Sequence, residues 1–225
     1  IYNFIFSSSC TVYGNIEHGK ETDQNLSQTC PYGRTKFFIE NILRDVSKAN
    51  KNFKSVILRY ANPVAAHSSG KLGDNPTRGQ KNLFPIIEDV LKGEREKIVI
   101  FGGDYNTRDG TCIRDYLHVS DIAQGHIYVL KCFEDNFKHV FNDNSVIYNM
   151  GTSNGASVKE VIDTYTEVCG KKIPYVIGDR RIGDAAINVP NSEKIKNELG
   201  WAPKATLKDM CKDSYNYAKL SIKDK

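Results

Sequence analysis

Tyr32 and Lys36 stand four residues apart near the start of a predicted helix, which Pro31 opens and which runs to about Asn50. Four residues is just over one helical turn, so the phenol and the ammonium emerge on one face. A fixed neighbouring cation favours a phenolate, and a phenolate can act as a base. The alternative is a solvated Tyr and Lys on a surface helix, because Tyr-x-x-x-Lys is a short motif.

Small hydroxyl residues follow the first predicted strand. Residues 3–7 form an apolar run typical of a buried parallel strand, and Ser-Ser-Ser-Cys-Thr-Val-Tyr-Gly (7–14) continues from its end. Open α/β sheets bind ligands at the carboxyl ends of their strands. The segment is therefore either a ligand-binding edge or an ordinary Ser-rich turn.

The order of predicted elements indicates an α/β fold. A strand, the helix at 31–50 and a second strand at 54–60 imply a right-handed crossover and a parallel sheet. A Gly-, Pro- and Ser-rich segment at 61–82 is long enough to be a binding loop. Ser120 and Asp121 are a predicted N-cap, and Ser157 is another. Further predicted elements are helices at 82–92, 192–199 and 207–220 and strands at 97–101, 147–151 and 173–177.

Composition narrows the functional classes. The net charge of +4 over 225 residues is spread along the chain, with a Lys-rich block only at its end, so nucleic-acid binding has little support. No apolar run reaches membrane-spanning length, and the first residues lack the pattern of a signal peptide, so we expect a soluble, cytoplasmic protein with no membrane partner. The six cysteines form no Cys-x-x-Cys pair, which predicts reduced thiols and neither a zinc site nor a disulfide framework.

Several separated motifs agree with one known family. Besides the 7–14 segment and the Tyr32/Lys36 pair, they are Leu-Arg-Tyr-Ala-Asn-Pro (58–63), Phe-Gly-Gly-Asp-Tyr (101–105) and Asp-Gly-Thr-Cys-Ile-Arg-Asp-Tyr-Leu-His-Val-Ser-Asp (109–121). In this order they resemble the extended short-chain dehydrogenase/reductases, and in detail the UDP-glucose 4-epimerases. The resemblance covers nearly the whole chain. It implies an isomerase that interconverts UDP-glucose and UDP-galactose by transient hydride transfer at sugar C4 to NAD+.

The resemblance also implies roles for the residues at the strand edge. Tyr32 would exchange the proton of the sugar 4-hydroxyl, and Lys36 would hold the cofactor ribose and support the Tyr32 phenolate. Ser9 would bond the sugar 4-oxygen, with Thr11 close to the same oxygen. Ser7 and Tyr60 would lie at the nicotinamide.

A second implied set would bind the UDP-sugar. It supplies guanidinium groups for the diphosphate, amides for the sugar side, a strand facing uracil and a carboxylate for the ribose. Its members are Asn62, Asn82, Leu83, Val99, Ile100, Phe101, Arg114, Tyr116, Arg181, Asp184 and Asn188. Ala61 replaces a bulkier residue of the family, which predicts a looser sugar pocket, and Asn188 leaves acceptance of acetamido sugars open.

The expected domain organisation is interleaved. Residues 1–61 and 116–149 would form part of a Rossmann-like NAD-binding domain, and residues 62–115 and 150–225 a smaller α/β UDP-sugar-binding region. The Gly-x-x-Gly-x-x-Gly turn that receives the NAD pyrophosphate is not found in this sequence. We therefore expect the 225-residue chain to need an upstream segment for NAD binding and turnover. Family resemblance further implies a homodimer through a helical bundle that includes the Tyr32 helix.

Two other readings stay open. Nucleotide-sugar dehydratases and decarboxylases share the Tyr-x-x-x-Lys motif and the NAD site. Dehydratases usually carry an Asp-Glu pair near Val-Tyr-Gly, where this chain has Cys10, Thr11 and Val12, so an epimerase is favoured. The other reading is a non-catalytic UDP-sugar-binding fragment that keeps Arg114, Arg181 and Asp184 but binds no cofactor.

Overall fold

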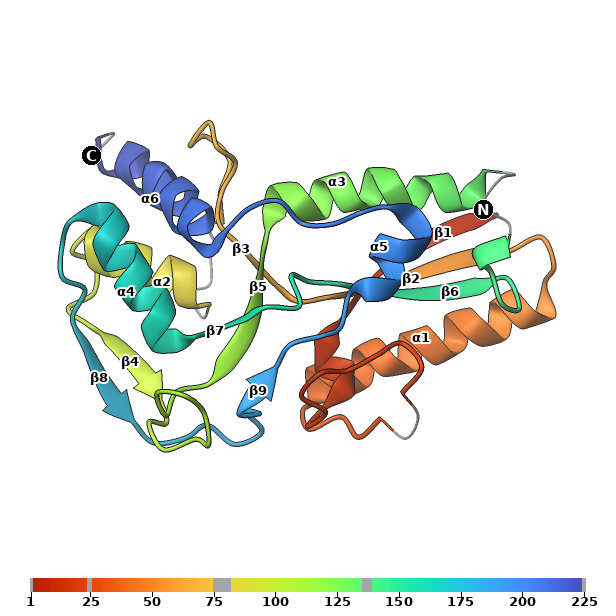
Figure 1. The fold of residues 1–225 in the computed structure, drawn as a ribbon, viewed down its shortest axis with the longest axis horizontal. Coiled ribbons are helices and arrows are strands. Elements are labelled where there is room, and N and C mark those ends of the chain that lie inside the picture. The colour runs from red at the N-terminus through yellow and green to blue at the C-terminus, as the bar shows by residue number, and fades with distance from the viewer. Residues whose placement is uncertain (1, 24–25, 75–81, 135–138, 224–225) are drawn as a thin grey trace.

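A parallel sheet forms one end of an elongated molecule with two lobes (Figure 1). The computed structural model describes residues 2–23, 26–74, 82–134 and 139–223. The sheet has the order β1-β2-β6, from β1 (Asn3–Ser9), β2 (Lys54–Tyr60) and β6 (Ser145–Met150). All three strands are parallel, and Ser9 pairs with Tyr60. The predicted parallel pairing and the strand at 54–60 are confirmed.

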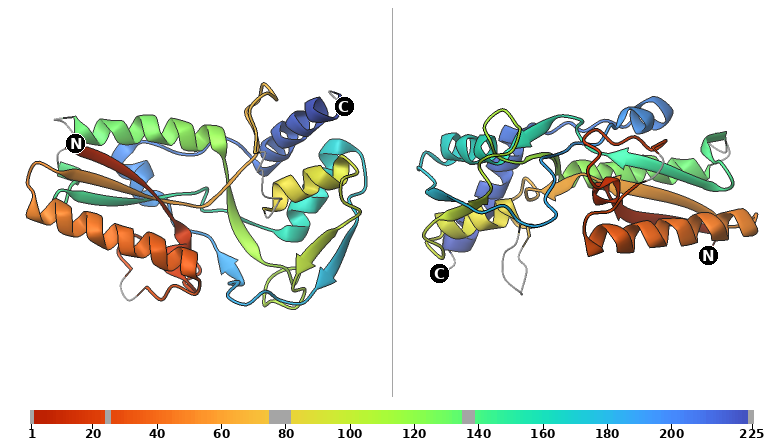
Figure 2. Two further views of the ribbon diagram at one scale, coloured as in Figure 1. Left: turned by 180° about the vertical axis from the view of Figure 1, so that it is seen from behind. Right: turned by 90° about the horizontal axis from the view of Figure 1, so that it is seen from below.

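Helices cover both faces of this sheet. In Figures 1 and 2, α1 (Pro31–Ala49) lies on one face and α3 (Val119–Leu130) on the other. The middle strand β2 is consequently buried from Ser55 to Arg59, as expected for a strand between two helical layers. The core on this side combines Val56, Leu58, Leu117, Val146, Tyr148 and Trp201.

The second lobe is mainly helical. It holds α2 (Leu83–Leu91), α4 (Val158–Cys169) and α6 (Leu207–Lys223), with a parallel pair of strands, β4 (Ile98–Phe101) and β8 (Tyr175–Gly178). Its core combines Phe84, Ile87, Ile98, Ile100, Val161, Tyr165 and Met210. The two lobes therefore have separate hydrophobic cores.

Strand β5 (Ile113–His118) runs between the lobes (Figure 1). It pairs with β3 (Asn62–Val64) and β9 (Ile187–Asn188) in parallel and with β7 (Gly155–Ser157) in antiparallel. The short 3-10 helices are η1 (Cys10–Tyr13), directly after β1, and η2 (Lys131–Phe133), directly after α3. Segments from the early, middle and late parts of the chain thus meet around β5.

Two sequence predictions need correction. Ser120 and Asp121 do not cap α3, because the N-cap is His118, whose Nδ1 accepts the Ser120 N–H at 3.0 Å. The boundary predicted at residue 150 also fails in part, since Ile195 and Leu199 of α5 (Glu193–Leu199) pack in the core of the first sheet. The Ser157 cap is confirmed, and it forms a capping box with Glu160.

Three further observations concern membrane helices, metal sites and disulfides. No helix among the described residues is long and apolar enough to cross a membrane. Within the described ranges, no cluster of three or more His, Cys, Asp or Glu side chains is arranged to hold a metal ion. All six cysteines are free thiols.

Of the predicted loop at 61–82, residues 75–81 lie outside the described part.

Candidate functional site

The Tyr32/Lys36 pair lies where β1 ends. Lys36 Nζ is 5.6 Å from the centre of the Tyr32 ring and donates to the Ser7 carbonyl oxygen at 2.7 Å. The Tyr32 ring is 54% exposed, so the phenol faces open space. The predicted shared helix face is confirmed, and the helix brings a phenol and an ammonium to the sheet edge together.

Gly33 allows the first turn of α1 to close on η1. A Cβ atom at Gly33 would lie 2.8 Å from the Thr11 carbonyl oxygen, which is inside van der Waals contact. Helices normally favour alanine over glycine, so close backbone approach is the physical reason for a glycine here. The turn that carries Tyr32 is thereby held against the segment that carries Ser9 and Thr11.

Ser9 and Thr11 form a local hydroxyl pair. Ser9 Oγ accepts the Thr11 N–H at 3.2 Å and the Thr11 hydroxyl at 3.0 Å, which caps η1. Because Ser9 accepts both bonds, its own O–H is left to donate elsewhere. Both side chains are only partly buried, and the part that stays exposed is accessible to a ligand oxygen at the strand edge.

Ser7 and Tyr60 are also joined, and a third residue extends their contact. Ser7 Oγ lies 3.0 Å from the Tyr60 hydroxyl, which lies 2.9 Å from His126 Nε2 on α3. Burial raises the pKa of Tyr60, and the bond to Ser7 opposes that rise. Sequence reasoning missed His126, because a histidine on the partly buried side of a helix has no motif of its own.

A second cluster holds the predicted nucleotide-binding charges. Arg181 Nε bonds Asp184 Oδ2 at 2.8 Å, and Arg114 Nη2 lies 3.7 Å from Asp184 Oδ1. The Arg181 guanidinium stacks on the exposed ring of Phe101, 4.7 Å from its centre. One carboxylate therefore holds two guanidinium groups, next to an aromatic ring that can stack on a base.

Arg180 fixes the segment that carries Arg181, and sequence reasoning missed it. Its guanidinium donates to the Asp104 carboxylate and the Asp104 carbonyl oxygen, both at 2.7 Å, and stacks on Tyr105 at 4.2 Å. The bond to Arg180 lowers the pKa of Asp104. Arg180 thus ties residues 179–184 to the loop after β4.

The two clusters meet through β9. Asn188 pairs with Arg114 in the sheet and donates from Nδ2 to the Cys10 carbonyl oxygen at 3.4 Å. The Thr29 hydroxyl, just before α1, donates to the Gly183 carbonyl oxygen at 3.3 Å. The Tyr32 edge and the Arg181 cluster therefore lie against each other, although about 150 residues separate them in sequence.

The structure does not present all predicted substrate residues to the surface. The side chains of Ile100 and Tyr116 are 2% and 5% exposed and belong to the second core, where Tyr116 packs on Phe84 with ring centres 5.8 Å apart. Strand alternation turns Val99 and Phe101 outward instead. Asn62 and Asn82 are exposed, and Leu83 packs against the second core.

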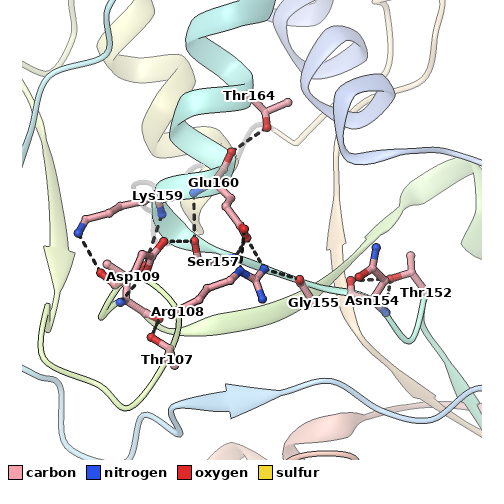
Figure 3. A network of polar contacts seen from close by, with 11 residues as sticks. Thr107, Arg108, Asp109, Thr152, Asn154, Gly155, Ser157, Lys159, Glu160 and Thr164 are labelled. Carbon is pink, nitrogen blue, oxygen red and sulfur yellow. Dashed lines mark hydrogen bonds and ion pairs between the residues drawn. The ribbon is translucent and has the colours of Figure 1, made fainter.

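A polar network lies just before β5, the strand that contains Arg114. Figure 3 shows this network. Asp109 accepts the Thr111 N–H at 2.8 Å and the Ser157 hydroxyl, and Lys159 Nζ donates to the Asp109 carbonyl oxygen at 3.0 Å. Arg108 pairs with Glu160 of the same capping box. The bond from Arg108 lowers the pKa of Glu160. Together these contacts tie the loop at 102–112 to α4.

Chains of similar sequence and fold are known. A family model described as the NAD dependent epimerase/dehydratase family matches residues 1–151. The protein "UDP-glucose 4-epimerase 2" of Arabidopsis thaliana is 44% identical over 217 residues, which cover 96% of this chain. A UDP-glucose 4-epimerase of Stenotrophomonas maltophila with bound NAD and formylated UDP-arabinopyranose superposes with a TM-score of 0.92 at 36% identity, covering 100% of this chain and 66% of that one.

A further solved structure agrees. The UDP-glucose 4-epimerase of Bifidobacterium longum, in complex with NAD+ and UDP, has a TM-score of 0.88 and 42% identity, covering 98% of this chain and 64% of that one. The chain spans 61% of the length of the Arabidopsis relative. The similarity therefore covers this chain almost completely and its relatives only in part.

Proposed function

We propose, because this chain belongs to the NAD dependent epimerase/dehydratase family, that it carries the catalytic and substrate-binding parts of a UDP-glucose 4-epimerase. Its reaction is the interconversion of UDP-glucose and UDP-galactose. The observation that carries the proposal is the continuity of two clusters. The Tyr32/Lys36 edge is joined through Asn188 to the cluster formed by Arg114, Asp184 and Arg181.

The residues at the edge of β1 suit proton transfer at a sugar hydroxyl. Tyr32, as a phenolate supported by the Lys36 ammonium, takes the proton of the 4-hydroxyl, and the protonated phenol returns it in the second half of the reaction. Ser9 donates its free O–H to the same sugar oxygen, and Thr11 holds Ser9 in place. NAD+, when bound, supplies the acceptor and later the donor of the hydride at C4.

The Arg181 cluster suits a nucleoside diphosphate. The guanidinium groups of Arg114 and Arg181 bind phosphate oxygens, and their ion pairs with Asp184 hold them ready for that contact. Asp184 can in turn accept a ribose hydroxyl, and Phe101 offers a ring face to the base. The proposed substrate-binding region is thus the second lobe together with β5 and β9.

The residues present fit one end of NAD. Lys36 Nζ, the Ser7 hydroxyl and the Tyr60 hydroxyl converge at the carboxyl edge of β1, where they would hold the nicotinamide and its ribose. The glycine-rich turn for the pyrophosphate is not found among these 225 residues. We propose that this chain supplies the nicotinamide end of the cofactor site.

An exposed apolar strip and the free thiols support two further proposals, on oligomeric state and on compartment. The outer face of α1 exposes Phe38, Ile39, Ile42 and Val46, an apolar strip that supports a homodimer through this helix. Six free thiols support a reducing, cytosolic compartment. Size-exclusion chromatography with light scattering tests the first proposal, since Ile42→Glu should shift a dimer to a monomer.

Calorimetry and an epimerase assay test the proposed function. We expect the 225-residue chain to bind UDP. When it is preceded by the N-terminal segment of the Arabidopsis relative, we expect it to convert UDP-galactose to UDP-glucose. Tyr32→Phe should lower kcat by at least about 100-fold, the usual contribution of a general acid-base. The matched control is Tyr128→Phe, because Tyr128 lies on α3 in the first lobe and belongs to neither cluster.

Two results would overturn the proposal. Absence of UDP binding would remove the substrate class, and full activity of Tyr32→Phe would remove the mechanism. UDP binding without turnover, both in the 225-residue chain alone and in the chain preceded by the Arabidopsis segment, would favour the non-catalytic UDP-sugar-binding alternative. A dehydratase would instead release a 4-keto-6-deoxy sugar product, which the same assay detects by mass.

A further inference from the structure

Three side chains from three elements form one hydrogen-bonded chain beside the proposed cofactor edge. Ser7 Oγ of β1 lies 3.0 Å from the Tyr60 hydroxyl of β2, and that hydroxyl lies 2.9 Å from His126 Nε2 of α3. His126 Nδ1 lies 2.9 Å from the backbone carbonyl oxygen of Ile122. The Ser7 end is exposed, whereas Tyr60 and His126 are partly buried.

The Ile122 carbonyl fixes the direction of every bond in this chain. A carbonyl oxygen can only accept, so the proton of the neutral imidazole must stand on Nδ1. His126 Nε2 is then an acceptor, and the Tyr60 hydroxyl donates to it. The Tyr60 oxygen is left to accept, and Ser7 donates to Tyr60.

This order determines what Ser7 can offer a ligand. The Ser7 proton is committed to Tyr60, so the exposed lone pairs of Ser7 Oγ can only accept. Lys36 Nζ, which donates to the Ser7 carbonyl oxygen at 2.7 Å, stands beside the same residue as a cationic donor. Ser7 therefore presents an acceptor next to an ammonium, a combination that suits a ligand with an N–H group.

We propose that His126 is a positioning residue that, through Tyr60, holds Ser7 as an acceptor for the carboxamide N–H of a nicotinamide ring. The inference rests on the proposed function for the identity of the cofactor. It adds a selectivity that the fold alone does not carry. A dinucleotide whose ring bears a carboxylate in place of the carboxamide has no N–H for Ser7 and should bind more weakly.

The first test needs no ligand. Nitrogen-15 NMR of the histidine rings of the 225-residue chain, at about pH 8 where ordinary histidines are neutral, reports which ring nitrogen carries the proton. We expect the Nδ1–H tautomer for His126, assigned by its loss in His126→Phe. Free imidazole side chains prefer Nε2–H, so His67, an exposed histidine, serves as the internal reference. An Nε2–H tautomer at His126 overturns the proposal.

The second test measures selectivity in the chain preceded by the N-terminal segment of the Arabidopsis relative. The ratio of Kd for nicotinic acid adenine dinucleotide to Kd for NAD+ should fall by about tenfold in His126→Phe, because Ser7 is then free to donate. Ser7→Ala should lower the ratio similarly, and the double variant should add nothing further. An unchanged ratio in His126→Phe overturns the inference.

A control variant accompanies this test, and its outcomes distinguish failure of the inference from failure of the proposed function. His67→Phe, which removes a histidine far from this chain of bonds in the sequence, should leave the ratio unchanged. If His126→Phe does not fold, His126→Ala replaces it with the same expected fall in the ratio. His126→Gln is the rescue variant, because its amide oxygen can accept from Tyr60 and should retain the ratio. An Nε2–H tautomer in a chain that still epimerises would remove this inference alone, whereas loss of UDP binding would remove the proposed function.

Discussion

Glu40 belongs to the helix that carries Tyr32 and Lys36, and its buried carboxylate accepts hydrogen bonds from Nε and Nη2 of Arg59. The Nη2–Oε2 distance is 2.7 Å, and the two side chains are 3% and 1% exposed. Ser8 donates to the same carboxylate, and the Arg59 guanidinium stacks on Tyr13 at 4.8 Å. One buried ion pair thus joins α1, β1, β2 and η1 at the place where the proposed catalytic residues begin.

Removing one partner of this pair should be costly. We expect Glu40→Ala to lower the free energy of unfolding by about 3–5 kcal/mol, because Arg59 would remain buried without its counter-ion. Urea denaturation measures the change. Asp45→Ala, on the exposed side of α1, should change stability by less than about 0.5 kcal/mol. The double variant Glu40→Met/Arg59→Met should regain most of the loss, and a double loss equal to that of Glu40→Ala would refute this explanation.

Stability should depend on pH through Glu88. Burial raises the pKa of this carboxyl from its ordinary value of 4.5 to about 7, and Ser214 donates to it. A raised carboxyl pKa contributes stability that is complete below about pH 4.5 and is lost as the pH rises to about 7. A difference of this size is worth about 3 kcal/mol. Glu88→Gln should therefore be more stable than the parent at pH 8, and the two should be equal near pH 4.5.

Denaturation at a series of pH values checks this dependence. Asp115, whose pKa burial raises to about 6, contributes in the same direction, but the variant and the parent share it. The difference between the two curves therefore isolates Glu88. Asp163→Asn, an exposed carboxylate of α4, is the control and should run parallel to the parent. Parallel curves for Glu88→Gln would show that Glu88 titrates normally.

Affinity for UDP should depend on Arg181. We expect Arg181→Ala to weaken UDP binding by about tenfold or more, since a charge-assisted contact to a phosphate contributes about 1.5–3 kcal/mol. Isothermal titration measures the change in Kd. Arg44→Ala removes the same charge from the exposed surface of α1 and should leave Kd within about twofold at moderate salt. Equal losses in both variants would indicate general charge attraction rather than a site.

The capping box of α4 should contribute to the stability of the second lobe. Ser157→Ala removes the bond to the Glu160 N–H and the bond to Asp109, so we expect a loss of about 1–2 kcal/mol. Ser192 occupies the N-cap of α5 without a side-chain cap bond in the described part of the chain. Ser192→Ala should therefore cost less than about 0.5 kcal/mol, and thermal unfolding compares the two. A loss from Ser192→Ala as large as that from Ser157→Ala would contradict the role of the bond.

The elements with strong local signals were predictable from sequence. The strand at 54–60 is recognisable as an apolar run, since a strand covered by helices on both faces needs apolar residues on both. Ser157 is recognisable as a cap because Ser-x-x-Glu satisfies two backbone N–H groups at once. Tyr32 and Lys36 share a helix face for reasons of helical geometry alone. These signals depend on neighbours in the chain, which a single sequence supplies.

The features that depend on distant partners were not predictable. Apolar residues of α1 such as Ile39, Ile42 and Val46 suggest a core-facing stripe, yet they are exposed. The buried residues of the helix are Gly33, Glu40, Leu43 and Ser47. Small residues let the helix approach the sheet, and Ser47 bonds Ser55 of β2 at 2.8 Å. Periodicity identifies a stripe but does not identify the surface that covers it.

Side-chain direction was likewise beyond the sequence. Motif resemblance placed Ile100 and Tyr116 with the substrate residues, but strand alternation and packing on Phe84 turn both into the second core. His118 became the N-cap of α3 because its ring folds back to the Ser120 N–H. The position of a residue in a motif therefore predicts which part of the fold contains it, but not whether its side chain faces the ligand.

The late positions of core residues in the sequence set the order in which the protein can fold during synthesis. Trp201 completes the core of the first sheet, and Met210 and Cys211 complete the core of the helical lobe. A nascent chain that has emerged only as far as β8 lacks part of both cores and exposes apolar strands to solvent. Folding must therefore wait until nearly all of these residues have left the ribosome, and chaperone capture of the unfinished chain is the expected cost of that delay.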